Sequence, residues 1–457
     1  WALVLYIVAQ FHAGDGSGQA AANLTYGSFL ALVYAGALFG GYLADRIIGY
    51  QRSILLGAVF MAAGLFCISV PNQDIFNLGL ATMIVGNGMF KPNISTMVGK
   101  LYTTADPRRD SGFTIFYMGI NMGAMVAPVF TQWLAESIFG TSAMPSYKMV
   151  FMASGFGMLI SLVWFFIGRR ALKGIGAPEA GSGNPMRVVW VALGCLCVIP
   201  LMYFLLTVGA EKLQIVLTVL FVGLAFMLMI EGIRNGKVAR DRVIAMLLIF
   251  VFNILFWMFF EQAGSSFTFL ADKIVNRDLG FWIFPTAYFQ TVNSVAIIVF
   301  APLIAAVWVY LARHNVNPSI PRKFGLGLLG NALAFGLLIF ALSSLVGADN
   351  KIPFWTLFMV YVIQSVGELC LSPIGLSMVT KLAPVRLVGF GMGGWFLSTG
   401  IGNNLSGIFA GHVSGEGGMT TASALSGYTF GFWALVGSGV LLFLIAPLIQ
   451  KLMHGVK

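Results

Sequence analysis

The chain has 457 residues, of which 58% are hydrophobic and only 9% are charged. A soluble globular protein carries about 25% charged residues on its surface, so this composition excludes a soluble protein, and its hydrophobicity excludes a disordered one. The four cysteines lie in apolar stretches and are too few for a secreted disulfide scaffold. We therefore expect an all-α protein that crosses a membrane many times.

Apolar segments of membrane-spanning length recur along the chain. A hydrocarbon core of about 30 Å requires about 20 apolar residues per helix. The first segment is shorter than this, so we expect the chain to begin inside its first membrane helix. The fourteen segments are 1–11, 24–45, 52–70, 75–101, 109–135, 147–168, 187–207, 213–234, 243–271, 281–312, 325–346, 353–383, 386–412 and 427–450.

The loop charges predict an orientation for these segments. If the loop that contains Arg46 and Arg52 is cytoplasmic, twenty loop lysines and arginines fall on that side and five on the other. Cytoplasmic loops are enriched in positive charge. The bias therefore supports fourteen membrane-spanning segments, with both termini in the cytoplasm.

Three ionisable residues lie well inside apolar segments. They are Lys91, Glu261 and Glu368, and each costs about 2.5–3.5 kcal/mol at the centre of a membrane helix on insertion scales. One interpretation is an ion pair that locks two helices together. We favour a substrate or proton site, and both hold if the ion pair breaks during a transport cycle.

The positions of two of these charges indicate an internal repeat. Lys91 is in the fourth segment from the start, and Glu368 is in the fourth segment after the pair 187–207 and 213–234. Transporters built from repeats place their site where the repeats meet, near the membrane midplane. This predicts an N-terminal six-helix bundle with an incomplete first helix, a linker with an inserted helical hairpin, and a C-terminal six-helix bundle, at residues 1–170, 171–240 and 241–457.

Polar and aromatic side chains accompany the charges inside the apolar segments. They include Tyr34, Tyr117, Asn121, Asn293, Gln364, Ser372 and Trp395. Tyr117 and Asn121 are four residues apart and so share one helical face. Pro92 and Pro373 follow two of the charges and should free backbone carbonyls that can face a cavity.

Patterns typical of other protein classes are missing from the sequence. There is no G-x-x-x-x-G-K-S/T phosphate loop, and the glycine run 389–394 lies in an apolar segment, where it favours helix packing. The histidines are scattered at segment ends and form no metal-ligand pattern. We expect no metal, no cofactor and no enzymatic activity.

Four stretches resemble known transporters. Gly40–Gly49 with Arg52 is similar to the loop after the second helix of major facilitator transporters. Phe116–Gly123 resembles the F-Y-x-x-I-N-x-G signature of the proton-dependent oligopeptide transporter (POT) family. Gly367–Ser377 and Gly391–Leu397 resemble that family's tenth and eleventh helices. The hairpin at 187–234 is similar to the extra helix pair of prokaryotic members.

The resemblance implies a symporter that imports di- and tripeptides with protons across the bacterial inner membrane. Two six-helix bundles of the major facilitator fold would rock around a central cavity, and the protein would act as a monomer. Lys91 and Glu368 would clamp the two ends of the peptide. The family's first helix carries an E-x-x-E-R-F motif that would lie upstream of Trp1.

The resemblance also implies roles for further residues. Glu261 would couple transport to protons, because a carboxyl group in a low dielectric either pairs with a cation or takes up a proton. Hydrogen bonds to the peptide would come from Tyr34, Tyr117, Asn121, Asn293 and Ser372, and the side-chain pockets would be lined by Trp257 and Trp395.

Three alternatives stay open. The first is a major facilitator transporter of nitrate or another small anion, although a carboxylate such as Glu368 would repel an anion. The second is a sensor that binds peptides without moving them. The third is a membrane-embedded enzyme, for which the short loops offer no nucleophile or metal cluster.

Overall fold

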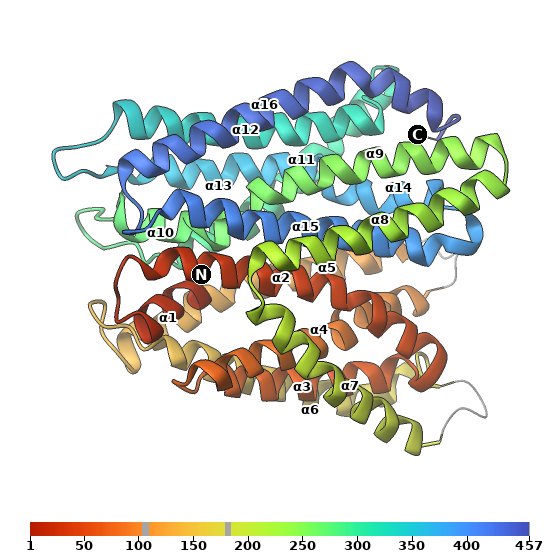
Figure 1. Cartoon of the computed structure of the whole chain (residues 1–457), viewed down its shortest axis with the longest axis horizontal. Helices are drawn as coiled ribbons and strands as arrows, with labels where there is room; N and C mark the ends of the chain where they lie inside the picture. The colour runs from red at the N-terminus through yellow and green to blue at the C-terminus, as the bar shows by residue number, and fades with distance from the viewer. Residues whose placement is uncertain (103–108, 179–183, 457) are drawn as a thin grey trace. The chain divides into compact units, whose positions relative to one another are not determined.

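A computed structural model describes residues 1–102, 109–178 and 184–456 (Figure 1). The described residues are predominantly helical, which confirms the all-α prediction. Their one sheet pairs two short parallel strands, β1 (Val275–Asn276) and β2 (Ile352–Pro353). The α-helices are α1 (Ala2–Phe11), α2 (Gly18–Leu43), α3 (Tyr50–Ile68), α4 (Gln73–Lys100), α5 (Arg109–Trp133), α6 (Tyr147–Gly168), α7 (Met186–Thr207), α8 (Ala210–Arg234), α9 (Lys237–Phe260), α10 (Ser266–Lys273), α11 (Tyr288–Arg313), α12 (Ile320–Ser344), α13 (Phe354–Leu369), α14 (Ser372–Leu382), α15 (Val388–Ser414) and α16 (Thr421–Leu452).

Each predicted apolar segment contains a helix in the structure. Segments 243–271 and 353–383 are divided, the first into α9 and α10 and the second into α13 and α14. Among the described residues, ten helical stretches have the length and hydropathy to cross a membrane. The chain is thus organised as a multi-pass membrane protein.

Several helices begin away from their predicted starts. Helices α9, α12 and α16 begin at Lys237, Ile320 and Thr421 rather than at residues 243, 325 and 427. Helix α2 begins at Gly18 rather than at residue 24. The side chain of Gln19 in its first turn is buried and accepts a hydrogen bond from the Met419 amide. Helix α11 begins at Tyr288 rather than at residue 281. The preceding residues form a tight turn instead, closed by the bridge between Asp278 and Ile283.

Contacts group the chain into two compact units. Unit 1 contains Trp1, Leu3–Gly27 and Ala210–Lys457, and unit 2 contains Ala2 and Ser28–Gly209. Of the hairpin helices, α7 therefore belongs to unit 2 and α8 to unit 1. The bundle boundaries near residues 170 and 240 stay a prediction.

Glycines allow close helix packing in unit 2. A Cβ atom on Gly40 of α2 would lie 1.8 Å from the carbonyl oxygen of Gly88 in α4. Such a contact is possible only without a side chain, and small residues commonly provide it between membrane helices. Asn93 reinforces the junction, because its buried amide donates to the Gly40 carbonyl and to Ser53 Oγ of α3.

Unit 1 is held together by stacked helices and an aromatic core. Helices α12 and α16 pack side by side, as Figure 1 shows. Phe267 of α10 contacts the rings of Phe335, Tyr361 and Tyr428, which come from α12, α13 and α16. This cluster fixes the short helix α10 against three long ones.

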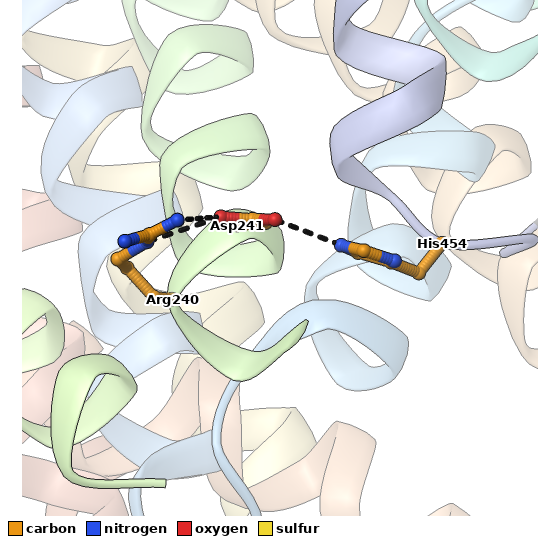
Figure 2. A network of polar contacts seen from close by, with 3 residues as sticks. All are labelled: Arg240, Asp241 and His454. Atoms are coloured by element: carbon orange, nitrogen blue, oxygen red, sulfur yellow. Dashed lines mark hydrogen bonds and ion pairs between the residues drawn. The ribbon is translucent and has the colours of Figure 1, made fainter. Parts of the chain in front are cut away.

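A polar network joins the end of α16 to the start of α9. Asp241 lies between Arg240 and His454, as Figure 2 shows. Its Oδ1 accepts from Arg240 Nη2 at 2.9 Å, and its Oδ2 lies 2.9 Å from His454 Nε2. The aspartate side chain is only 9% exposed, whereas those of His454 and Arg240 are 33% and 43% exposed.

We expect His454→Ala to lower the melting temperature of the detergent-solubilised protein by roughly 2–4 °C. The change removes the more buried of the two partners of a carboxylate that is shielded from water. Arg240→Ala should have a smaller effect, because exposed ion pairs are weak. His314→Ala is the control, because the contacts of His314 with described residues are local, a hydrogen bond to the Tyr310 carbonyl and a contact with the Tyr310 ring. Equal melting temperatures for the His454 and His314 variants would show that the network is not stabilising.

Candidate functional site

The boundary between α9 and α10 is a break in a membrane-spanning stretch. A single 3-10 turn, η4 (Glu261–Gly264), separates the two helices, and Glu261 is its first residue. The break releases the Ala263 carbonyl from regular helical bonding. Tyr361 Oη of α13 donates to that oxygen at 3.0 Å, and Gln290 Nε2 of α11 also donates to it. Two side chains from neighbouring helices thus hold the turn that carries Glu261.

A second break lies between α13 and α14, and Glu368 is one residue before the end of α13. Asn293 Nδ2 of α11 lies 2.8 Å from Ser365 Oγ and 3.4 Å from Glu368 Oε2, and it donates to both. Ser372 opens α14, and its buried hydroxyl makes no hydrogen bond to any residue that the structure describes. Breaks of this kind, lined by polar groups, are typical of binding sites in transporters.

Each of the two breaks in unit 1 carries a carboxylate. Glu261 is the first residue of η4, and Glu368 is one residue before the end of α13. Two like charges at a poorly solvated site are disfavoured unless one is protonated or a cation lies near them. The site is therefore suited to bind a positive group or a proton.

Both predicted pocket tryptophans lie in unit 1. Trp395 of α15 is 5% exposed and packs against Phe250 and Phe324. Trp257 of α9 is half-buried, and its indole Nε1 donates to Asn253 Oδ1 at 3.0 Å.

The predicted site residues of unit 2 include an exposed cation. Lys91 is exposed on α4, and its Nζ lies 4.7 Å from the centre of the Tyr34 ring on α2, a cation–π contact. On α5, the Asn121 amide is buried and donates to the Tyr117 carbonyl one turn earlier, while the Tyr117 side chain is exposed.

The structure thus brings together some of the predicted residues. Asn293 donates a hydrogen bond to Glu368, and Lys91 makes a cation–π contact with Tyr34. Lys91 and Glu368 belong to different units. Gln364 shares a helical face with Glu368, but its amide donates to Asn331 Oδ1 in the core.

Sequence reasoning missed several residues that support the site. They are Asn253, Gln290, Tyr361 and Ser365. Gln290 lies three residues before Asn293, and Ser365 lies three residues before Glu368. This helical spacing could have indicated that Gln290 and Ser365 share a face with those predicted site residues.

Ten apolar helical stretches of membrane-spanning length among the described residues, two of them broken beside carboxylates, are typical of a multi-pass membrane transporter. A family model described as "POT family" matches residues 51–420, and the chain belongs to that family. This is a family of transporters and not of enzymes. The resemblance found in the motifs is thereby confirmed.

Curated bacterial relatives cover most of the chain. Dipeptide and tripeptide permease B of Salmonella typhimurium is 33% identical over 89% of this chain and 81% of its own length. The peptide transporter YePEPT of Yersinia enterocolitica is 32% identical over 91% of this chain and 84% of its own length. An uncharacterized transporter, YclF of Bacillus subtilis, is 32% identical over 97% of this chain and 88% of its own length.

Solved structures of the family share the fold. A peptide transporter POT in complex with alafosfalin has a TM-score of 0.81 and 29% identity, covering 99% of this chain and 92% of that one. A POT family transporter in complex with 5-aminolevulinic acid also has a TM-score of 0.81, with 27% identity over 98% and 92% of the two chains. The predicted major facilitator fold with its inserted hairpin is confirmed.

Proposed function

We propose that this chain is a proton-coupled symporter that imports di- and tripeptides by alternating access. The observation that carries the proposal is Glu368, held by Asn293 at a helix break inside the membrane. The peptide permeases among its relatives support the substrate class.

The peptide termini explain why opposite charges are needed. Every unmodified di- or tripeptide has an ammonium group at one end and a carboxylate at the other, whatever its side chains. Glu368 binds the ammonium group, and Lys91 attracts the carboxylate. The two charged residues then bind the termini, which are the same in every peptide. The variable side chains require only a pocket that can accommodate different shapes.

The remaining predicted residues complete the site. Ser372 offers a hydroxyl without a partner among the described residues, and Asn293 lies beside Glu368. Tyr34, Tyr117 and Asn121 supply hydrogen bonds from unit 2, while Trp257 and Trp395 line the side-chain pockets.

Glu261 is the proton-coupling residue in this proposal. Glu261 is the first residue of the turn between α9 and α10. A change in its charge can therefore alter the conformation of that helix break. Protonation of Glu261 releases a salt bridge and permits the conformational change. Protons are the coupling ion, and no cofactor is needed.

The proposal also includes the setting of the protein. It resides in the bacterial inner membrane as a monomer, with both termini in the cytoplasm. The bundles 1–170 and 241–457 move relative to each other, and residues 171–240 form the linker and hairpin.

Uptake into proteoliposomes tests the proposal. With the interior more alkaline than the medium, we expect radiolabelled dialanine to accumulate above its external concentration, intact and only while the gradient persists. Binding without accumulation would indicate a sensor, and recovery of free alanine an enzyme. Accumulation of nitrate in place of dialanine would indicate the anion transporter.

A further inference from the structure

The strongest unassigned feature near the site is a buried asparagine on α9. Asn253 is 0% exposed and uses both ends of its amide. Its Oδ1 accepts from Trp257 Nε1 at 3.0 Å. Its Nδ2 donates to Ser398 Oγ at 2.8 Å and to Thr399 Oγ1 at 3.1 Å, both on α15.

The hydroxyl groups on α15 fix the orientation of this amide. Ser398 Oγ donates to the Trp395 carbonyl at 2.7 Å, and Thr399 Oγ1 donates to the same carbonyl at 3.2 Å. Each hydroxyl has one hydrogen, which is already used, so each can only accept from Asn253. The indole N–H of Trp257 can only donate. Asparagine in this orientation satisfies all three neighbours at once.

The network therefore connects both proposed pocket tryptophans. It runs from the Trp257 indole through Asn253 and the two hydroxyls to the backbone of Trp395. The Trp395 ring is fixed by packing, because a Cβ atom on Gly375 would lie only 2.0 Å from its Cη2. The Trp257 ring is half-buried and packs edge-on against Phe256 and Phe260. Its hydrogen bond to Asn253 selects one orientation of this more accessible ring.

From this geometry we infer that Asn253 is a positioning residue that sets the side-chain selectivity of the peptide site by holding the Trp257 indole against α15. The inference rests on the proposed function. Asn253 acts on the variable part of the substrate, while the termini are bound by Glu368 and Lys91. A change at Asn253 should therefore alter the relative KM values of peptides with different side chains more than it alters the KM for a peptide with small side chains.

The test compares KM values for dialanine and alanyl-phenylalanine in proteoliposomes. Asn253→Leu removes all three hydrogen bonds at similar volume, and Trp257→Phe removes the indole N–H while keeping an aromatic ring. We expect each variant to change the ratio of the two KM values by about 10-fold, the lower end of the effect of a small change in a hydrophobic pocket. In Asn253→Leu, which leaves the residues that contact the peptide in place, the KM for dialanine should change less than about twofold.

A double-mutant cycle separates positioning from loss of stability. The Asn253→Leu and Trp257→Phe effects on the ratio should not add, because both remove the same contact. Asn331→Leu is the matched control: Asn331 is equally buried, and its Oδ1 accepts from Gln364 rather than from a tryptophan. This variant should leave the ratio unchanged. If Asn253→Leu does not fold, Trp257→Phe alone still tests the contact.

Two results would overturn the inference. One is an unchanged ratio in the variants that fold, and the other is an equal rise in both KM values, which a purely structural role predicts. Both results require that the wild-type protein transports dialanine. Wild-type protein that transports no peptide refutes the proposed function itself, and the inference with it.

Discussion

Replacing Glu368 with Gln should raise the KM for dialanine by about 100-fold. The substitution keeps the size and hydrogen-bonding capacity of the side chain but removes the charge that binds the ammonium group. Loss of one partner of a poorly solvated charge pair costs about 2–5 kcal/mol, and a 100-fold change corresponds to about 2.7 kcal/mol. Counterflow in proteoliposomes measures the change without a pH gradient.

Modified peptides show which terminus each charge binds. N-acetylation of dialanine should weaken uptake by the wild type strongly, yet cause little further loss in Glu368→Gln. Lys91→Gln should behave likewise toward a C-terminal amide. Glu416→Gln is the control, since it removes an exposed glutamate from the loop between α15 and α16. A normal KM for dialanine in Glu368→Gln would show that the peptide amine binds elsewhere.

The Glu261→Gln variant should lose accumulation driven by a pH gradient, falling at least about tenfold, while exchange of peptide across the membrane continues. Glutamine resembles the protonated acid and cannot release a proton, so the cycle is no longer linked to the gradient. Uptake against a gradient and exchange at equal concentrations are measured on the same proteoliposomes.

The control for this variant is Glu211→Gln, which removes an exposed charge from the first turn of α8. It should retain both activities. Accumulation at the wild-type level in Glu261→Gln would assign the proton to another residue. Loss of exchange together with accumulation would place Glu261 in binding rather than in coupling.

Composition and segment length were sufficient to predict an all-α protein that crosses the membrane many times, because a membrane helix must contain about 20 apolar residues regardless of its neighbours. The major facilitator fold followed only from the resemblance of the motifs. The helix breaks could not be predicted in the same way. Pro373 has no N–H to offer the carbonyl four residues earlier, and the break lies at that point, between Leu369 and Ser372. Pro92 removes the same bond, yet α4 continues through it from Gln73 to Lys100. Tertiary packing decides between these outcomes, and the local sequence does not encode it.

The residues of the candidate site likewise divide into those that the sequence could predict and those that it could not. Lys91, Glu261 and Glu368 could be selected from the sequence, because an isolated charge in an apolar segment is costly. Asn253 could not, because its role depends on Ser398 and Thr399, which are about 145 residues away. Polar residues in a membrane helix are therefore easy to find, but their partners require the structure.

A structure of the chain with bound dialanine, determined in lipid nanodiscs, would show whether Glu368 and Lys91 bind the two ends of one peptide. We expect the peptide amine within about 3 Å of a Glu368 carboxylate oxygen, as charge-assisted hydrogen bonds require. We expect the peptide carboxylate within about 4 Å of Lys91 Nζ in the same complex. A dialanine molecule that touches neither residue, or only one of them, would refute the proposal that these two charges clamp the peptide.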